Sequence, residues 1–524
     1  MRLGEVGGHR EGAGLWPARE LFGSSPESDR FGGVALGILV WALLWLAIGA
    51  SLSLSPPVDS VEQLAWVRSI EWGYYKHPPL PTMMLWPFVH VFGIHEWVAA
   101  SVGAGLVCGA VWVSWRLTCE LLGAHRAGLA MLGTLCVTYY TTRIDYYNHN
   151  VVLLLFVAGA AWFCWRAFAA RSLWAWFGVG CMWGLGALSK YQIALACVST
   201  LYVWLRHRGW RDPLHRRGLV LAAGVAALIF MPHLAWLVEN DFPPVHYALS
   251  SSLGADLPTY QRMLHSLNWL VAQLGRLVPS LLFGIGLALW VRTRRGAMSE
   301  SVTPGASAAV VDAAPSFLFA WGALPLLTVT FVGLVTGADL QLQWGTAFLP
   351  LTCAWLIQCT PRAGWQRVRW RDAMVAFVLV QVLIATFDWA TSPMGPNATV
   401  IRHRNRNFPS QAIADVLGPA AREALHGPID IIAGPAGYAE TLSLRLAERP
   451  LVLIDGCVER SPWFKAQPLE GRPLLWVGGE DDDPPPGAEP LPLPDGLWWA
   501  VAEGPQACSS AAEKKRAGTR GAQD

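Results

Sequence analysis

Charge is the scarcest property of this 524-residue chain. Charged residues make up 15% of it, while hydrophobic residues reach 53% and tryptophan occurs 29 times. Soluble domains carry roughly 25% charged residues, so this chain has too few to cover a water-facing surface. It is predicted to be a multi-pass membrane protein whose main surroundings are the lipid bilayer. The net charge of +2 lacks the basic excess of a nucleic-acid-binding surface, so no nucleic acid is expected as a partner.

Cysteine motifs are also missing. The 10 cysteines form no CxxC pair and no cysteine–histidine zinc spacing, which excludes the common structural zinc sites. Most of them lie in or beside apolar segments, where a thiol behaves as a small buried hydrophobe. Only Cys457 and Cys508 lie in the polar C-terminal part, and they could form a disulfide in an oxidising compartment.

Long apolar runs fill the chain up to residue 391. Runs of about 16 to 24 residues are long enough to cross a bilayer, and they fall at about 34–54, 96–116, 127–142, 149–167, 173–189, 191–206, 217–238, 270–291, 315–337, 341–359 and 373–391. They predict an all-α polytopic membrane domain with about 11 transmembrane helices. The stretch from Pro78 to Gly93 is shorter and begins with prolines, which favours an interfacial or re-entrant helix.

Lysine and arginine fall on alternate sides of these spans. With the N-terminus inside, the inner segments hold about 20 of them and the outer loops about six. This predicts a cytoplasmic tail (1–33), a transmembrane domain (34–392), a small periplasmic α/β domain (393–505) and a disordered tail (506–524). The α/β domain is expected from the short β-rich runs around the helix-like "AETLSLRLAE". The predicted location is the inner membrane of a bacterium.

Four predicted outer loops carry the unusual polar residues. Asp59 and Glu62 lie three residues apart, so a helix would place both carboxylates on one face. The other candidates follow in chain order: Tyr75, Lys76 and His77 in "GYYKHPPLP"; Arg143, Asn148, His149 and Asn150 in "TTRIDYYNHN"; Lys190 in "LSKYQ"; and Asp241, His246 and Arg262 in the loop that begins "ENDFPP".

Each loop by itself has a simpler interpretation. The first loop, which holds Asp59, is also typical of an amphipathic helix capped by an aspartate. Lys190 is also typical of a lysine whose aliphatic chain extends along the membrane so that its ammonium reaches the headgroups. Ionisable groups that converge at one membrane face are functional candidates, however. Together they predict an outer cavity for an anionic lipid head such as a polyprenyl phosphate.

The chemistry predicted for this cavity divides its residues into two roles. Cations neutralise phosphate oxygens, a role expected of Lys76, His77, Arg143, Lys190 and Arg262. A carboxylate accepts the proton of an attacking hydroxyl, and Asp59 is the first candidate. Glu62, Tyr75, Asn148, His149, Asn150, Asp241 and His246 are predicted to support the site.

Asp59 followed by "GYYKHPPL" resembles the first outer loop of bacterial PMT-type membrane glycosyltransferases. This family, glycosyltransferase family thirty-nine of the GT-C superfamily, includes the dolichyl-phosphate-mannose protein mannosyltransferases and the lipid A aminoarabinose transferases. The resemblance continues through "YYNHNVVLLLF", "GLGALSKYQ" and "WLVENDFPPVHYAL", and "SPWF" in the C-terminal part is similar to a periplasmic domain of one subgroup.

The resemblance implies a GT-C fold and inverting transfer of a sugar from a polyprenyl-phosphate donor to lipid A, another envelope glycan, a lipid or a protein. It also implies that Asp59 is the catalytic base, that Lys190 lies near the phosphate and that His77 is the basic residue before the prolines. Ser60 departs from the family's acidic pair, and Asn150 stands where relatives often have Asp. Lys76 replaces an acid that helps some relatives bind a divalent metal, so a divalent metal here is possible but doubtful, and no cofactor is certain.

Two other functions use similar features. A transporter or flippase of lipid-linked sugars would also have many spans, but its charges should lie near the bilayer midplane, often in two repeated halves. Here the charges cluster in outer loops, and the sequence shows no internal repeat. A polysaccharide polymerase or ligase would share the donor chemistry without the "Asp…HPPL" arrangement.

Overall fold

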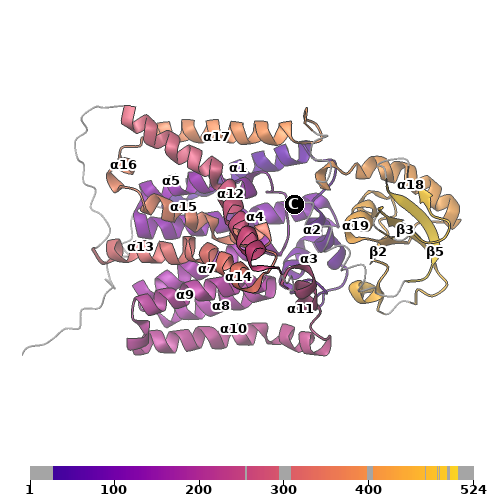
Figure 1. Ribbon diagram of the computed structural model, residues 1–524, viewed down its shortest axis with the longest axis horizontal. Helices are drawn as coiled ribbons and strands as arrows, with labels where there is room; N and C mark the ends of the chain where they lie inside the picture. The colour runs from indigo at the N-terminus through magenta and orange to yellow at the C-terminus, as the bar shows by residue number, and fades with distance from the viewer. Residues whose placement is uncertain are drawn as a thin grey trace, which may run out of the picture.

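The computed structural model describes residues 28–253, 257–293, 308–397, 405–465, 468–480, 482, 484–491 and 496–505. A bundle of helices makes up most of the molecule, and a small α/β domain lies against one end of it (Figure 1). The expected all-α membrane domain with a small C-terminal α/β domain is confirmed. The predicted tail from 506 to 524, which includes Cys508, lies outside the described residues, as does most of the N-terminal tail.

Seven spans of the described residues are long and apolar enough to cross a membrane. They are formed by α1 (Ser28–Ser51), α4 (Glu96–Leu122), α7 (His149–Ala169), α10 (Pro213–Glu239), α12 (Thr259–Thr293), α13 with α14 (Ala308–Gly322 and Leu324–Thr336) and α17 (Trp370–Ala390).

The other four predicted spans are helical but shorter. They correspond to α5 (Ala124–Thr134), α8 (Leu173–Ser189), α9 (Ala194–Arg206) and α15 (Leu349–Gln358). Two of them are preceded by 3₁₀ turns, at Tyr191–Ile193 and Leu342–Phe348, whose larger rise of about 2.0 Å per residue lengthens the segment. The prolines of "GYYKHPPLP" are followed by the short helix α3 (Leu80–Phe92), as predicted. The remaining short helices are α2 (Val58–Trp66), α6 (Thr138–Thr141), α11 (Pro243–Ala248) and α16 (Arg362–Gln366).

Small residues allow the helices to approach closely. A Cβ at Gly180 of α8 would lie 2.6 Å from the carbonyl oxygen of Ala222 in α10, and a Cβ at Gly218 would overlap the Trp176 ring. Apolar helices in lipid gain little from burial alone, so close packing of this kind contributes much of their association.

The C-terminal domain is built on a five-stranded sheet of order β2-β1-β3-β5-β4. Its strands are β1 (Ile431–Gly434), β2 (Leu451–Ile454), β3 (Pro473–Gly478), β4 (Glu489–Pro490) and β5 (Trp498–Glu503). β1 runs parallel to β2 and β3, whereas β5 is antiparallel to β3 and to β4. Helices α18 (Ser410–Leu425) and α19 (Ala436–Arg445) complete the domain. Cys457 is disulfide-bonded.

Helix α2 is shared between the two parts. Trp66 is fully buried and stacks on Tyr74 at 4.5 Å between ring centroids, and both join the hydrophobic core of the C-terminal domain. Arg445 of α19 forms an ion pair with Glu96 of α4 at 2.9 Å. The C-terminal domain therefore covers α2 at Trp66.

Candidate active site

A cavity of about 1850 Å³ opens where the end of the bundle meets the C-terminal domain. All four loops predicted to lie outside contribute to it, and α2, α3 and α11 lie at this end of the bundle (Figure 1). Its lining includes these predicted residues: Asp59, Glu62, Tyr75, Lys76, His77, Arg143, His149 and Lys190. The folding of the chain thus brings together residues that are more than 130 positions apart in the sequence.

Asp59 lies in the first turn of α2 and is held from one side. The side-chain nitrogen of Asn148 donates to Asp59 Oδ2 at 2.8 Å. Asn148 itself is the N-cap of α7, and its Oδ1 accepts from the backbone N–H groups of Asn150 and Val151, both at 3.0 Å. Such a cap stabilises a helix end, and here it also fixes the position of the carboxylate.

Lys76 and Glu62 form a close pair. Lys76 Nζ lies 2.5 Å from Glu62 Oε1, and both side chains are largely buried. The rings of Tyr75 and Tyr247 lie 5.1 Å and 5.7 Å from the ammonium. Burial lowers the pKa of Lys76, but the Glu62 carboxylate outweighs this and holds it well above its usual value. The charge of Lys76, predicted for a phosphate, is already compensated by Glu62.

Lys190 meets two histidines in a different environment. Its Nζ donates to Asn150 Oδ1 at 2.5 Å, and the Asn150 amide also contacts the His149 ring at 3.2 Å. The rings of His149 and His77 lie 3.6 Å apart. Burial lowers the pKa of Lys190 to about 7, with Asp59 opposing the shift.

His77 lines the cavity, as predicted, in surroundings that disfavour its charged form. Burial, followed by the charges of Lys190 and Lys76, lowers its pKa well below the usual value. The ring is therefore neutral at pH 7, and it can offer a phosphate one hydrogen bond but no charge.

Two arginines lie near Tyr139 on another side of Asp59. Arg143 packs over the Tyr146 ring at 5.3 Å, and Arg276 of α12 lies over Tyr139 at 5.4 Å while donating to the carbonyl of Leu342 at 2.6 Å. Burial raises the pKa of Tyr139 to about 12 against the opposing effect of both arginines. Among the described residues, no carboxylate lies within ion-pair distance of Arg143, Arg276 or Lys190.

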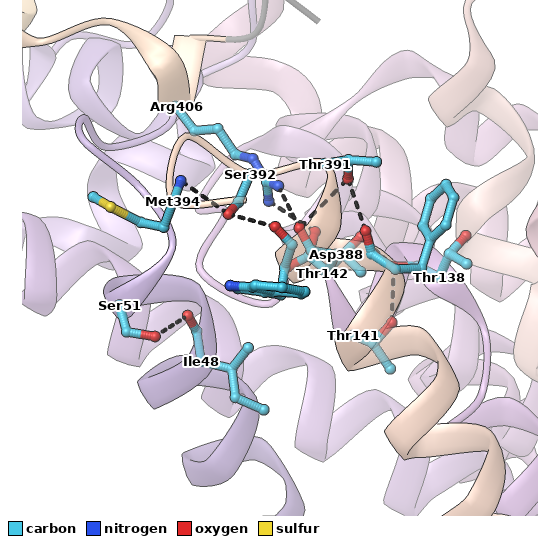
Figure 2. A network of polar contacts seen from close by, with 12 residues as sticks. Ile48, Ser51, Thr138, Thr141, Thr142, Asp388, Thr391, Ser392, Met394 and Arg406 are labelled. Atoms are coloured by element: carbon cyan, nitrogen blue, oxygen red, sulfur yellow. Dashed lines mark hydrogen bonds and ion pairs between the residues drawn. The ribbon is translucent and has the colours of Figure 1, made fainter. Parts of the chain in front are cut away.

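A second buried pair closes the cavity beside the chain's path into the C-terminal domain. Arg406 donates to the Asp388 carboxylate at 2.8 Å and to the Asp388 carbonyl at 3.0 Å, and Figure 2 shows Thr391 and Ser392 beside them. Asp145 lies near this pair, and burial raises its pKa to about 6. These interactions fix the wall of the cavity and cancel the charge of Arg406.

Three predicted residues lie apart from the cavity lining. Arg262 donates to the carbonyl oxygens of Leu257, at 2.5 Å, and Val335, at 3.1 Å. Asp241 and His246 are exposed and face each other at 3.7 Å. Asn148 and Asn150 are not in the lining either, but each bonds a residue that is, Asp59 and Lys190 respectively.

The structure adds residues that the sequence interpretation missed. Arg276 was not among the candidates because it lies within a long apolar run. An arginine inside such a run is itself a sign of a functional residue and could have identified it.

Glu440 of α19 is fully buried, and neither of its oxygens has a hydrogen-bond partner in the described residues. Burial, and after it Glu62, raises its pKa well above the usual value, which favours the protonated form of Glu440.

The described residues contain no group of three or more His, Cys, Asp or Glu side chains arranged to hold a metal ion. The lysine that replaces a family acid, Lys76, contacts Glu62 directly. These side chains do not fit a divalent metal ion.

Comparison with known proteins finds similarity to membrane glycosyltransferases. The family model described as dolichyl-phosphate-mannose-protein mannosyltransferase matches residues 76–236. Lipopolysaccharide core galacturonosyltransferase RgtB of Rhizobium johnstonii is 24% identical over 468 residues, which cover 86% of this chain and 89% of that protein. Lipid A galacturonosyltransferase RgtD of the same organism is 22% identical over 268 residues, 51% of this chain and 54% of RgtD, so the match spans about half of that relative.

The fold agrees with a solved structure. ArnT from Cupriavidus metallidurans in the apo state matches with a TM-score of 0.58 and 16% identity over 91% of this chain and 100% of that chain. The same protein bound to undecaprenyl phosphate matches with a TM-score of 0.57, 15% identity and coverage of 90% and 99%. The predicted resemblance is thereby confirmed: the chain is a multi-pass membrane protein similar to the PMT-type glycosyltransferases.

Proposed function

We propose that this protein is an inverting glycosyltransferase that moves a sugar from a polyprenyl-phosphate donor to a lipopolysaccharide acceptor, lipid A or core, at the periplasmic face of a bacterial inner membrane. One observation carries the proposal: an anchored carboxylate, Asp59, shares a cavity with cations that have no carboxylate partner among the described residues. The names of RgtB and RgtD support the acceptor class, and the undecaprenyl phosphate bound to ArnT supports the donor class.

In the proposed reaction an acceptor hydroxyl oxygen attacks the anomeric carbon of the donor sugar. A new C–O bond forms on one face while the bond to the phosphate oxygen breaks on the other, so the configuration inverts. The hydroxyl proton passes to Asp59 Oδ1, because Oδ2 is already bonded to Asn148. The electron pair leaves with the polyprenyl phosphate, whose added negative charge Lys190, Arg143 and Arg276 stabilise.

His77 and Glu62 have indirect roles in this scheme. The neutral His77 ring, packed on His149 beside Lys190, donates one hydrogen bond to the phosphate and keeps water from the ammonium. Glu62 holds Lys76 in place at the cavity wall. The loop "GYYKHPPLP" then shapes the donor side of the site through its fold, with Lys190 as the main cation.

The direct test uses the purified full-length protein in lipid nanodiscs. It is incubated with polyprenyl-phosphate galacturonate, the sugar indicated by the names of the relatives, and with lipooligosaccharide from a strain that lacks the gene. The expected result is release of polyprenyl phosphate together with a mass increase of one sugar on the lipooligosaccharide. Movement of the donor lipid between leaflets without a new glycosidic bond would instead support a flippase and overturn the proposal.

A further inference from the structure

The three parallel strands of the C-terminal sheet end at the active-site cavity. The segment after each of these strands contributes to the cavity lining. Pro435–Tyr438 follow β1, Asp455 and Arg460 follow β2, and Gly479, Glu480 and Asp482 follow β3. Ligands of open α/β sheets bind outside the carboxyl ends of the strands, where the strand order reverses. The order β2-β1-β3 has that reversal beside β1, at the edge that faces the cavity.

This carboxyl edge lies next to Asp59. A Cβ at Gly437, at the start of α19, would lie 3.6 Å from the Val58 side chain, and Val58 directly precedes Asp59. Arg460 lies over the ring of Tyr75 at 5.4 Å, which brings the β2 loop onto "GYYKHPPLP". A molecule bound at the edge would therefore touch the space in front of the carboxylate.

The charges of the edge are opposite to those of the membrane side. The edge carries three carboxylates, Asp455, Glu480 and Asp482, and one cation, Arg460, which pairs with Asp455 at 2.6 Å. The lining cations without a carboxylate partner among the described residues, Arg143, Arg276 and Lys190, all come from the membrane domain. A phosphate is favoured on the membrane side, whereas carboxylates accept hydrogen bonds from hydroxyl groups.

We propose that the carboxyl edge of the C-terminal sheet is the acceptor site of the enzyme, and that it binds a hydroxyl-rich saccharide through Glu480, Asp482 and Tyr438. Inversion requires the acceptor to approach from the side opposite the leaving phosphate, and the acidic edge and the cations of the membrane domain line the cavity from different domains. This inference rests on the proposed transferase function and assigns the second substrate to a named surface.

The test is steady-state kinetics of the full-length double variant Glu480→Gln/Asp482→Asn with lipooligosaccharide as the acceptor. The amide oxygen introduced by Asp482→Asn can still accept from the N–H of Gly479, as the Asp482 carboxylate does at 2.9 Å, so the turn is retained. We expect the acceptor KM to rise about tenfold or more, because two charge-assisted hydrogen bonds are weakened.

Glu489→Gln is the matched control, since Glu489 lies on β4 of the same sheet and outside the cavity lining. Its acceptor KM should equal that of the wild type. If the double variant unfolds at a lower temperature than the wild type, the acceptor KM of the single variant Glu480→Gln is used instead, because Glu480 is exposed and its substitution should not affect folding. An acceptor KM within about twofold of the wild type overturns the inference, whereas a wild-type protein that transfers no sugar overturns the proposed function instead.

Discussion

Lys76 and Lys190 line the same cavity, yet their neighbours act on the two ammonium groups in opposite ways. Lys76 contacts the Glu62 carboxylate at 2.5 Å, and its pKa is raised. Lys190 Nζ donates to the neutral Asn150 amide, and burial lowers its pKa to about 7. The first lysine is a structural brace, whereas the second is a cation whose charge is left for a ligand.

This difference separates a lysine whose charge the fold already neutralises from one whose charge it does not. Lys76 has its counter-ion in Glu62, so the net charge of the pair is zero. Lys190 has no such compensation in the described part of the chain, and an incoming phosphate would supply it.

The largest effect is expected from Asp59→Asn. The variant loses the proposed base and also the carboxylate that opposes the pKa shift of Lys190. We expect kcat to fall about 10³-fold, measured as release of polyprenyl phosphate in the presence of acceptor. Binding of polyprenyl phosphate, followed by native mass spectrometry, should persist. Sugar transfer at the wild-type rate would show that Asp59 is not the base.

Glu62→Gln should make Lys76 resemble Lys190. Removing one partner of a buried ion pair leaves an uncompensated charge and costs about 3 kcal/mol of unfolding free energy. We expect a lower thermal unfolding temperature for the purified protein. The double variant Glu62→Gln/Lys76→Met should recover most of the lost unfolding temperature. Equal unfolding temperatures for Glu62→Gln and the wild type would show that the Lys76–Glu62 pair does not stabilise the fold.

Lys190→Ala should raise the donor KM about 10- to 100-fold, because a charge-assisted contact with the phosphate is lost. Lys190→Arg keeps the charge and should bind the donor more tightly than the alanine variant. The wild-type donor KM in Lys190→Ala would mean that the phosphate is bound elsewhere in the cavity.

Arg276 and Arg262 offer a matched pair on α12. Arg276→Ala should raise the donor KM about tenfold, while Arg262→Ala should leave it unchanged because that guanidinium is bonded to backbone carbonyls outside the cavity lining. The reverse result would restore the role first predicted for Arg262.

The smallest effect is a pH dependence of donor binding. Only the protonated Lys190 attracts phosphate, so its contribution is complete well below pH 7 and is lost as the pH rises above it. With a pKa of about 7 in the unliganded protein, the donor KM should rise about fivefold between pH 7 and pH 8. Lys190→Arg should flatten this profile, and a wild-type profile that is already flat would contradict the lowered pKa.

Much of the fold and part of the site were predictable. The apolar runs located the helices because lipid requires long hydrophobic segments, and the loop motifs located Asp59 and Lys190. The sequence did not distinguish Arg276 from Arg262. These two lie 14 residues apart on α12, about 21 Å along a helix axis, and only the packing of α14 and the 3₁₀ turn at Leu342 decides which one reaches the cavity.

The residues that the C-terminal domain contributes to the cavity could not be predicted from the sequence for another reason. Composition identifies a domain but does not show which of its edges docks against a neighbour, so Glu440, Asp455 and Arg460 were not among the candidates. The pattern of a β-rich run followed at once by a polar residue, as in "LVLID" and "LLWVGGED", marks the carboxyl ends of strands and was the available signal.

Asn148 has a consequence for the stereochemistry of the base. Because its Oδ1 is occupied by two backbone N–H groups, its amide can turn only its NH₂ toward Asp59. That contact selects one rotamer of the carboxylate and leaves Oδ1 as the oxygen with basic lone pairs for the incoming proton. A glutamate at position 59 would carry the same charge on a longer arm, lose this alignment and, we expect, fail to replace the aspartate.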